Sequence, residues 1–274
     1  MARLVLVVPC YNEAARFDAP AFLHALDSLP SLQFCFVDDG STDDTLTALR
    51  QVRHQAPLDR VEILSLPRNA GKAEAVRRGL LHACAIVAES APEFCGFWDA
   101  DLSAPLTELP ALLAEFDREP TRQWIWGIRL RALGRDITRG TLRHYLGRGF
   151  ATATSLALGL GSYDTQCGAK LFRIDALLRE VVSEPFLSRW VFDVEMLSRA
   201  DQLLRAAGGD GAATLVYEQP LARWHHRGGS KVRATDFLRA LRELVAIRRG
   251  ASRWHRPTRP VAPEHASASI TVPT

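Results

Sequence analysis

The first half of the chain alternates short apolar runs with longer segments whose apolar residues recur at helical spacing. The apolar runs cover Leu4–Val8, Phe34–Val37, Val61–Leu66, Phe94–Trp98 and Trp124–Ile128. Helical spacing predicts helices over residues 21–29, 42–52, 72–88 and 107–116. Strands that are apolar throughout are buried on both faces, and their alternation with helices is typical of a mostly parallel α/β sheet.

The second half of the chain is less regular. Its pattern predicts a helix or a broken pair of helices over residues 142–158 and another helix over residues 194–206. Short strands are predicted over residues 170–172 and 214–218. We therefore expect one large domain that ends near residue 235.

The C-terminal part divides into two segments of different composition. Residues 236–249 are amphipathic and fit either a helix packed on the domain or a helix lying on an anionic membrane surface. Residues 253–274 are rich in Pro, Ala, Ser and Thr and predict a disordered tail. The expected organisation is a domain over residues 1–235, a helix over 236–252 and a tail over 253–274.

The composition is that of an ordinary globular protein. The 274 residues are 47% hydrophobic and 24% charged, enough for one large domain or two small ones. A net charge of +3 gives no general attraction to polyanions, but arginine is concentrated in residues 122–148 and 223–259 and could there meet phosphates or a membrane. The stacking-aromatic motifs of nucleic-acid-binding proteins are missing, so we expect no nucleic-acid partner.

The spacing of the cysteines and the length of the apolar runs indicate where in the cell the protein is found. The five cysteines have neither the spacing of a disulfide framework nor that of a zinc site, which predicts buried thiols in a reducing compartment. No apolar run approaches the roughly 20 residues of a membrane span, and the first residues lack a signal peptide. We expect a cytoplasmic protein that is soluble or attached to the surface of a membrane.

Polar clusters follow four of the predicted strands, where ligands of parallel α/β sheets bind. The clusters are Tyr11-Asn12-Glu13, Asp38-Asp39-Gly40-Ser41, Asn69-Ala70-Gly71-Lys72 and Asp99-Ala100-Asp101. The second fits a helix-capping turn, although carboxylates there could also accept hydrogen bonds from a base or a ribose. In the third, Gly71 permits a close approach of the backbone and the following helix start favours an anion.

Asp99 and Asp101 are two residues apart, so both side chains can point to the same side of an extended chain. Two neighbouring carboxylates repel each other unless a cation lies between them. They are either acids of a solvated turn or ligands of a hard divalent cation such as Mg²⁺ or Mn²⁺, which usually also binds substrate phosphates.

In their order and spacing the four clusters resemble the strand ends of family 2 glycosyltransferases, over roughly residues 1–235. This resemblance implies the GT-A fold, a Rossmann-like nucleotide-sugar-binding α/β fold with a mixed, mostly parallel sheet. By position it assigns the metal, Mg²⁺ or Mn²⁺, to Asp99 and Asp101. It assigns contacts with the nucleotide-sugar to nine residues, which are Pro9, Tyr11, Glu13, Asp38, Asp39, Lys72, Asp99, Ala100 and Asp101.

Motifs of the second half resemble those of dolichyl-phosphate β-glucosyltransferases. They are Asp-Thr-Gln-Cys-Gly-Ala-Lys-Leu-Phe at 164–172, Arg-Trp-Val-Phe-Asp-Val-Glu at 189–195, Gly-Ile-Arg at 127–129 and Gly-Ser-Lys at 229–231. The resemblance implies catalytic roles for Arg129, Gln166, Lys170, Arg189, Trp190 and Asp193. Cations should hold the acceptor phosphate, and we assign that contact to Arg143, Ser230 and Lys231.

The chain departs from these families at four positions. Lys72 is followed by Ala73 where the families commonly have glycine, and Ser103 stands where related mannose synthases often place a glutamine beside the metal. Ala169 replaces a phenylalanine, and Ile128 replaces a serine.

The resemblance implies metal-dependent, inverting transfer of a hexose, glucose from UDP-glucose, to a polyprenyl phosphate in a membrane. Such an acceptor is already anionic, so Asp193 would orient the sugar or the acceptor, whereas with a hydroxyl acceptor Asp193 would be the general base. The alternatives are a soluble hydroxyl acceptor, a GDP-mannose donor, or a catalytically idle nucleotide-binding module. The sequence predicts no oligomeric state.

Overall fold

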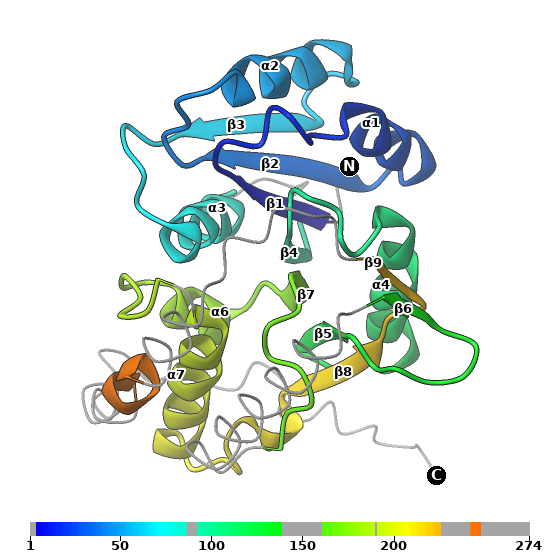
Figure 1. Ribbon diagram of the computed structural model, residues 1–274. Helices are drawn as coiled ribbons and strands as arrows, with labels where there is room; N and C mark the ends of the chain where they lie inside the picture. Colours follow the sequence, from blue (N-terminus) through cyan, green and yellow to red (C-terminus); the bar gives the residue numbers. More distant parts are fainter. Residues whose placement is uncertain (1–3, 87–91, 139–160, 190, 226–241, 248–274) are drawn as a thin grey trace, which may run out of the picture.

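The computed structural model describes residues 4–86, 92–138, 161–189, 191–225 and 242–247 (Figure 1). Several sequence predictions lie outside these residues. They are the helix over 142–158, the tail over 253–274, and four site residues, Arg143, Trp190, Ser230 and Lys231.

A sheet of seven strands forms the centre of the described fold, in the order β3-β2-β1-β4-β7-β5-β8. The strands are β1 (Leu4–Cys10), β2 (Leu32–Asp38), β3 (Val61–Ser65), β4 (Phe94–Trp98), β5 (Trp124–Ile128), β7 (Ala169–Arg173) and β8 (Val216–Pro220). Strand β7 runs antiparallel to both of its neighbours, and the other pairs are parallel. This confirms the prediction of a mixed, mostly parallel sheet.

Helices cover both faces of the sheet (Figure 1). On one face lie α1 (Ala19–Ser28), α2 (Thr45–Gln55) and α4 (Leu109–Arg118). On the other lie α3 (Lys72–Ala85), α6 (Ala176–Val181) and α7 (Phe192–Ala206). In β1, Leu4 and Leu6 face the first layer while Val5 and Val7 face the second, so the uninterrupted apolar run is explained by burial on both faces.

Short elements account for most differences from the predicted pattern. Strands β6 (Asp136–Thr138) and β9 (Arg223–His225) form a separate parallel pair, and α6 has six residues; three or six residues are too few to establish a period in the sequence. The turns η1 (Leu106–Glu108) and η2 (Ala212–Thr214) are single 3₁₀ turns, one preceding α4 and one preceding β8.

The polar ends of the strands meet at one edge of the sheet. Because β1 to β4 run parallel, their carboxyl ends lie together, as do those of β5 and β8. Antiparallel β7 begins at this edge, with Ala169 opposite Trp98, so the preceding loop at residues 161–168 also reaches it. We call this side of the sheet the strand-end edge.

The described part of the C-terminal segment, residues 242–247, is helical. Leu244 and Ile247 are buried and Glu243 accepts a hydrogen bond from the Ser188 hydroxyl, so this turn packs on the protein. Val245 in the same helical segment is half exposed. Among the described residues, no helix combines the length and the apolar character that crossing a membrane requires.

Candidate active site

The end of β2 supplies two buried carboxylates with different partners. Asp38 accepts hydrogen bonds from the Ser41 amide and the Ser65 hydroxyl, at 3.2 and 3.3 Å. Asp39 accepts from the amides of Ala70 and Gly71, at 2.7 and 2.8 Å. Burial raises the pKa of Asp39, and these two backbone hydrogen bonds act in the opposite direction. Asp39 therefore fastens the Asn69–Lys72 loop to the sheet, and Asp38 holds the turn beside it.

The end of β1 is fixed by contacts within the protein. The Glu13 amide donates to the Thr45 hydroxyl at 2.7 Å, and the buried Glu13 carboxylate pairs with Arg16. Ser41 and Thr42, predicted to start the second helix, instead hydrogen-bond with Asn12, and α2 starts at Thr45. The polar clusters of β1 and β2 thus hold each other, while Pro9 and Tyr11 are half-buried next to them.

Lys72, the first residue of α3, contacts the acid that follows β4. Its Nζ lies 2.5 Å from Asp99 Oδ1, and both side chains are 34% exposed. Burial lowers the pKa of Lys72, but the carboxylates of Asp99 and Asp193 outweigh it and the net shift is upward. Lys72 therefore stays charged among carboxylates, where it could meet the phosphates of a donor.

Asp101 lies in a tight turn after Asp99. Its Oδ1 accepts from the Ser103 amide at 2.9 Å, which stabilises the positive φ of 49° at the intervening, buried Leu102. The Ser103 carbonyl accepts from the His225 amide at 2.8 Å, so strand β9 supports this turn. Ala100 is buried between the two acids. The turn leaves both aspartate carboxylates at the strand-end edge.

Lys170 and Asp193 form a buried ion pair in the second half of the site. Lys170 Nζ, fully buried, lies 2.8 Å from Asp193 Oδ1 and donates to the carbonyls of Thr165 and Cys167 at 3.0 and 2.6 Å. Burial raises the pKa of Asp193, although Lys170 and Lys72 act in the opposite direction. Asp193 is the second residue of α7, so this pair joins α7 to the loop before β7.

Arg129 is held by Asp164. Its Nε and Nη2 donate to the two carboxylate oxygens at 2.6 and 2.7 Å, a paired geometry that fixes the guanidinium plane. Burial lowers the pKa of Arg129, but Asp164 outweighs it and the net shift is strongly upward. The Cζ atom of Arg129 also lies 5.3 Å from the centre of the Trp224 ring. Arg129 thus anchors the loop that carries Gln166 and Cys167.

The remaining predicted residues surround this centre. Arg189 Nη2 donates to Asn69 Oδ1 at 3.1 Å, which places Arg189 beside the loop that precedes Lys72. Gln166 Nε2 is buried without a hydrogen-bond partner in the described structure, so it is a donor that a bound ligand could use. Burial raises the pKa of the Cys167 thiol to about 12, in keeping with a structural thiol. All five cysteines are buried and free, as predicted.

Most residues of this site were named in the sequence analysis, but three residues that contact them were not. Asp164, Asn69 and Gly168 occur in the quoted motifs, yet no role was predicted for them. Asp164 orients Arg129, and Asn69 contacts Arg189. Asp164 and Arg129 belong to two different motifs, 35 residues apart in the sequence, so neither motif indicates that they pair.

Asp99 and Asp101 are the residues that could hold a divalent cation. Asp99 and Asp101 offer hard carboxylate oxygens at one edge, but the described residues contain no group of three His, Cys, Asp or Glu side chains that could hold a metal. Mg²⁺ is commonly held by one or two carboxylates together with substrate phosphates and water. The residues therefore fit a cation whose shell is completed by a diphosphate.

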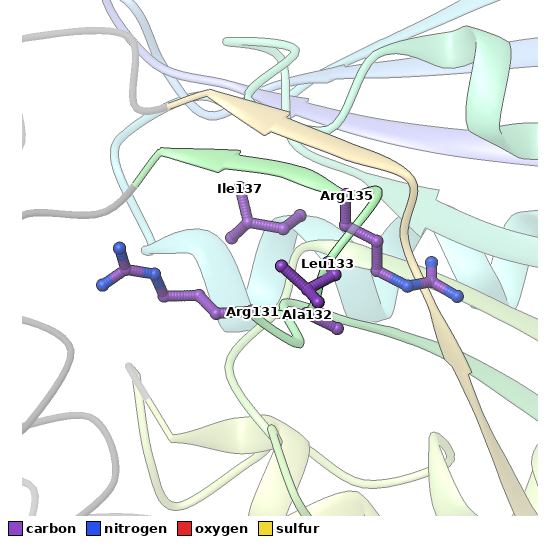
Figure 2. A pocket seen from close by; sticks show the side chains of 5 residues that line it. All are labelled: Arg131, Ala132, Leu133, Arg135 and Ile137. Carbon is purple, nitrogen blue, oxygen red and sulfur yellow. The ribbon is translucent and has the colours of Figure 1, made fainter.

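A shallow hollow opens beside the loop that follows β5. Its volume is about 480 Å³, and it is lined by Arg131, Ala132, Leu133, Arg135 and Ile137 (Figure 2). The guanidinium groups of Arg131 and Arg135 point in opposite directions in this view, and that of Arg135 donates to the carbonyls of Pro220 and Leu221. Leu133 is fully exposed. The hollow offers one exposed cation beside apolar side chains.

Gly168 lets the loop before β7 approach Asp99, and its replacement by alanine tests that contact. A Cβ atom would lie 2.1 Å from Asp99 Oδ2, so the carboxylate must move. We expect Gly168→Ala to lower the rate of the sugar transfer that the sequence motifs imply by about a hundredfold, the effect of a displacement of about 1 Å at a reacting centre. Steady-state kinetics check this. Gly161→Ala, where no atom lies within 4 Å, is the control and should retain activity.

Comparisons with known proteins agree with this fold. Glucosyl-3-phosphoglycerate synthase of Mycobacterium tuberculosis, solved in complex with Mn²⁺, UDP and glucosyl-3-phosphoglycerate, superposes with a TM-score of 0.62 at 20% identity, over 91% of this chain and 80% of that chain. This likeness shows the GT-A fold. The chain is 30% identical to a dolichyl-phosphate beta-glucosyltransferase of Dictyostelium discoideum, over 89% of this chain and 73% of the relative.

A second relative and a family model complete the comparison. A dolichyl-phosphate beta-glucosyltransferase of Saccharomyces cerevisiae is 31% identical, over 89% of this chain and 74% of the relative. The model of glycosyl transferase family 2 matches residues 5–179, which include the four strand-end clusters and the loop before β7. With its GT-A fold and its acidic strand-end edge, the chain therefore belongs to glycosyl transferase family 2 and is a glycosyltransferase.

Proposed function

We propose that this glycosyltransferase moves glucose from UDP-glucose to a polyprenyl phosphate, with inversion at the anomeric carbon. The observation that carries the proposal is the similarity, across 89% of the chain, to enzymes named dolichyl-phosphate beta-glucosyltransferase. The strand-end edge supports it, because it places acids and lysines where the donor of a sheet of this type binds.

The donor diphosphate would be received by residues from three strand ends. Asp99 and Asp101 would hold Mg²⁺ or Mn²⁺, which when bound supplies positive charge to the leaving diphosphate. Lys72, at the start of α3, adds a second positive charge at the same place. Asp38, which accepts hydrogen bonds from Ser41 and Ser65, would receive the base or the ribose. Together these groups stabilise the charge that develops as the bond to the sugar breaks.

An anionic acceptor fits the buried Asp193. A phosphate oxygen is already ionised at neutral pH and needs no general base, and Asp193 is paired with Lys170 at 2.8 Å. In this role Asp193 and Lys170 position the loop that carries Gln166. The hollow beside Arg131 and Leu133 supports the same acceptor, because it combines an exposed guanidinium with apolar surface. A lipid phosphate combines an anionic group, which a guanidinium can bind, with an apolar chain. An acceptor of this kind would place the enzyme at a membrane surface.

A soluble hydroxyl acceptor is the second candidate, and one observation favours it. Burial raises the pKa of Asp193, and a carboxylate with a raised pKa is a better general base for a hydroxyl group.

Transfer of radiolabelled sugar tests the proposal. The enzyme is supplied with UDP-glucose or GDP-mannose, and with either a polyprenyl phosphate in detergent or soluble hydroxyl acceptors. We expect labelled lipid from UDP-glucose, and we expect chelation of divalent cations to stop its formation. If no sugar donor yields labelled lipid, the lipid acceptor is wrong. Activity with hydroxyl acceptors alone, lost in Asp193→Asn, would establish the second candidate.

A further inference from the structure

Lys72 contacts a carboxylate oxygen of Asp99, the residue that is also a proposed ligand of the metal. Its Nζ lies 2.5 Å from Asp99 Oδ1, the distance of a direct charged contact. Lys72 is the first residue of α3, and its ammonium also lies 5.9 Å from the centre of the Phe97 ring. The two cations, the lysine and a divalent metal, therefore address the same carboxylate.

Asp99 has little freedom to turn away from Lys72. Its amide donates to the Gly168 carbonyl at 2.9 Å, which fixes the backbone. Its carboxylate lies against Gly168 so closely that a Cβ atom there would be 2.1 Å from Oδ2 and 2.4 Å from Oδ1. Because Gly168 closes off one side of this carboxylate, the direct way to free Oδ1 for a metal is a movement of Lys72.

Asp101, the second proposed metal ligand, does not make up for the Asp99 oxygen that Lys72 contacts. Asp101 Oδ1 accepts from the Ser103 amide at 2.9 Å, so one of its oxygens is also engaged. The described residues contain no group of three His, Cys, Asp or Glu side chains that could hold a metal. Asp99, Asp101 and Asp193 bring three negative charges, and Lys72 and Lys170 bring two positive ones. The net charge is −1, which attracts a free divalent cation only weakly.

We infer that Lys72 excludes the divalent cation from Asp99 until the donor diphosphate draws its ammonium away, so that nucleotide and metal bind together or nucleotide binds first. Lys72 has four methylene groups, and its ammonium can move while α3 stays in place. A diphosphate arriving at the strand-end edge offers that ammonium new anionic oxygens and supplies the metal ligands that the protein lacks. This inference rests on the metal assignment of the proposed function and adds an order of binding to it.

Binding of Mn²⁺ measured by electron paramagnetic resonance tests the inference without any sugar transfer. Lys72→Met keeps an unbranched side chain that is one atom shorter and removes its charge, which changes the net charge of the cluster from −1 to −2. Without nucleotide, we expect Lys72→Met to bind Mn²⁺ about tenfold more tightly than the wild type, equivalent to about 1.4 kcal/mol. With UDP present, the tightening of Mn²⁺ binding by nucleotide should be larger in the wild type than in Lys72→Met.

Two further variants separate local from general effects. Arg78→Met removes the same charge from the same helix at an exposed position paired with Glu74, so it should leave Mn²⁺ binding unchanged. Adding Asp99→Asn to Lys72→Met should cancel the gain. Circular dichroism confirms that each variant is folded.

The outcomes distinguish this inference from the proposed function. If the wild type binds Mn²⁺ with UDP, but Lys72→Met without UDP binds it no better than wild type or Arg78→Met, the exclusion by Lys72 is wrong and the metal site stands. If the wild type binds no Mn²⁺ even with UDP, the proposed metal site is wrong, and the inference falls with it.

Discussion

Replacing Asp101 by alanine is expected to abolish sugar transfer while the protein stays folded. Asp101 contributes a carboxylate to the proposed metal position, and loss of a group that stabilises developing charge costs about a thousandfold in rate. The structural cost is small, because Asp101 makes a single described hydrogen bond, to the Ser103 amide, whose loss costs about 1 kcal/mol. Labelled-sugar transfer and thermal unfolding measure the two effects separately.

Asp101→Asn is the matched variant for this prediction. The amide oxygen of asparagine can still accept from Ser103, so the turn with positive φ at Leu102 is retained while the charge is lost. We expect Asn to be nearly as inactive as Ala. Asp27→Ala, at an exposed position of α1, should keep full activity. Metal-dependent turnover that survives in Asp101→Ala would remove this residue from the metal site.

The sequence predicts the strand-end edge well because that edge depends on local patterns. Each of β1, β2 and β4 is an apolar run followed at once by polar residues, and parallel strands bring those ends together without further information. Asp38, Lys72 and Asp99 could therefore be expected to share one site. The boundaries were less accurate: α2 begins at Thr45, because Ser41 and Thr42 are used by Asn12.

The contacts that complete the site depend on the direction of β7, which the sequence does not reveal. Strand β7 pairs antiparallel with β4, so its start rather than its end reaches the strand-end edge. Only this reversal brings Gly168 against Asp99 and Lys170 beside Asp193. A run of three apolar or amphipathic residues looks the same in either direction, so Lys170 could be named from a motif but its partner could not.

Replacing Lys170 by methionine is expected to produce the largest loss of stability. Its ammonium is fully buried, contacts Asp193 at 2.8 Å, and lies 4.7 Å from the centre of the Trp126 ring. Removing one member of a buried ion pair leaves an uncompensated charge and costs about 3–5 kcal/mol. The carbonyls of Thr165 and Cys167 lose their donor as well. Denaturant unfolding measures the loss, and transfer activity should fall with it because the loop before β7 loses its anchor.

A double-mutant cycle shows whether the charge pair itself is responsible. Asp193→Asn removes the opposite charge, and in Lys170→Met combined with Asp193→Asn no buried charge remains at this pair. We expect the double variant to be less destabilised than the sum of the single variants by about 1–3 kcal/mol, the coupling usual for residues in contact. Additive losses would mean that the two side chains do not stabilise each other.

The dependence on pH gives an independent check with a defined sign. Burial raises the pKa of Asp193, and Lys170 acts against that rise, so the pKa should be higher still in Lys170→Met. A carboxyl group whose pKa is higher in the folded than in the unfolded state binds protons more readily when folded, and stability then falls as pH increases. The penalty of Lys170→Met should therefore be smallest near pH 4, where the unfolded carboxyl group titrates, and should grow toward neutral pH. A penalty that does not change with pH would show that lost packing and carbonyl contacts, and not the unpaired charge of Asp193, account for the instability.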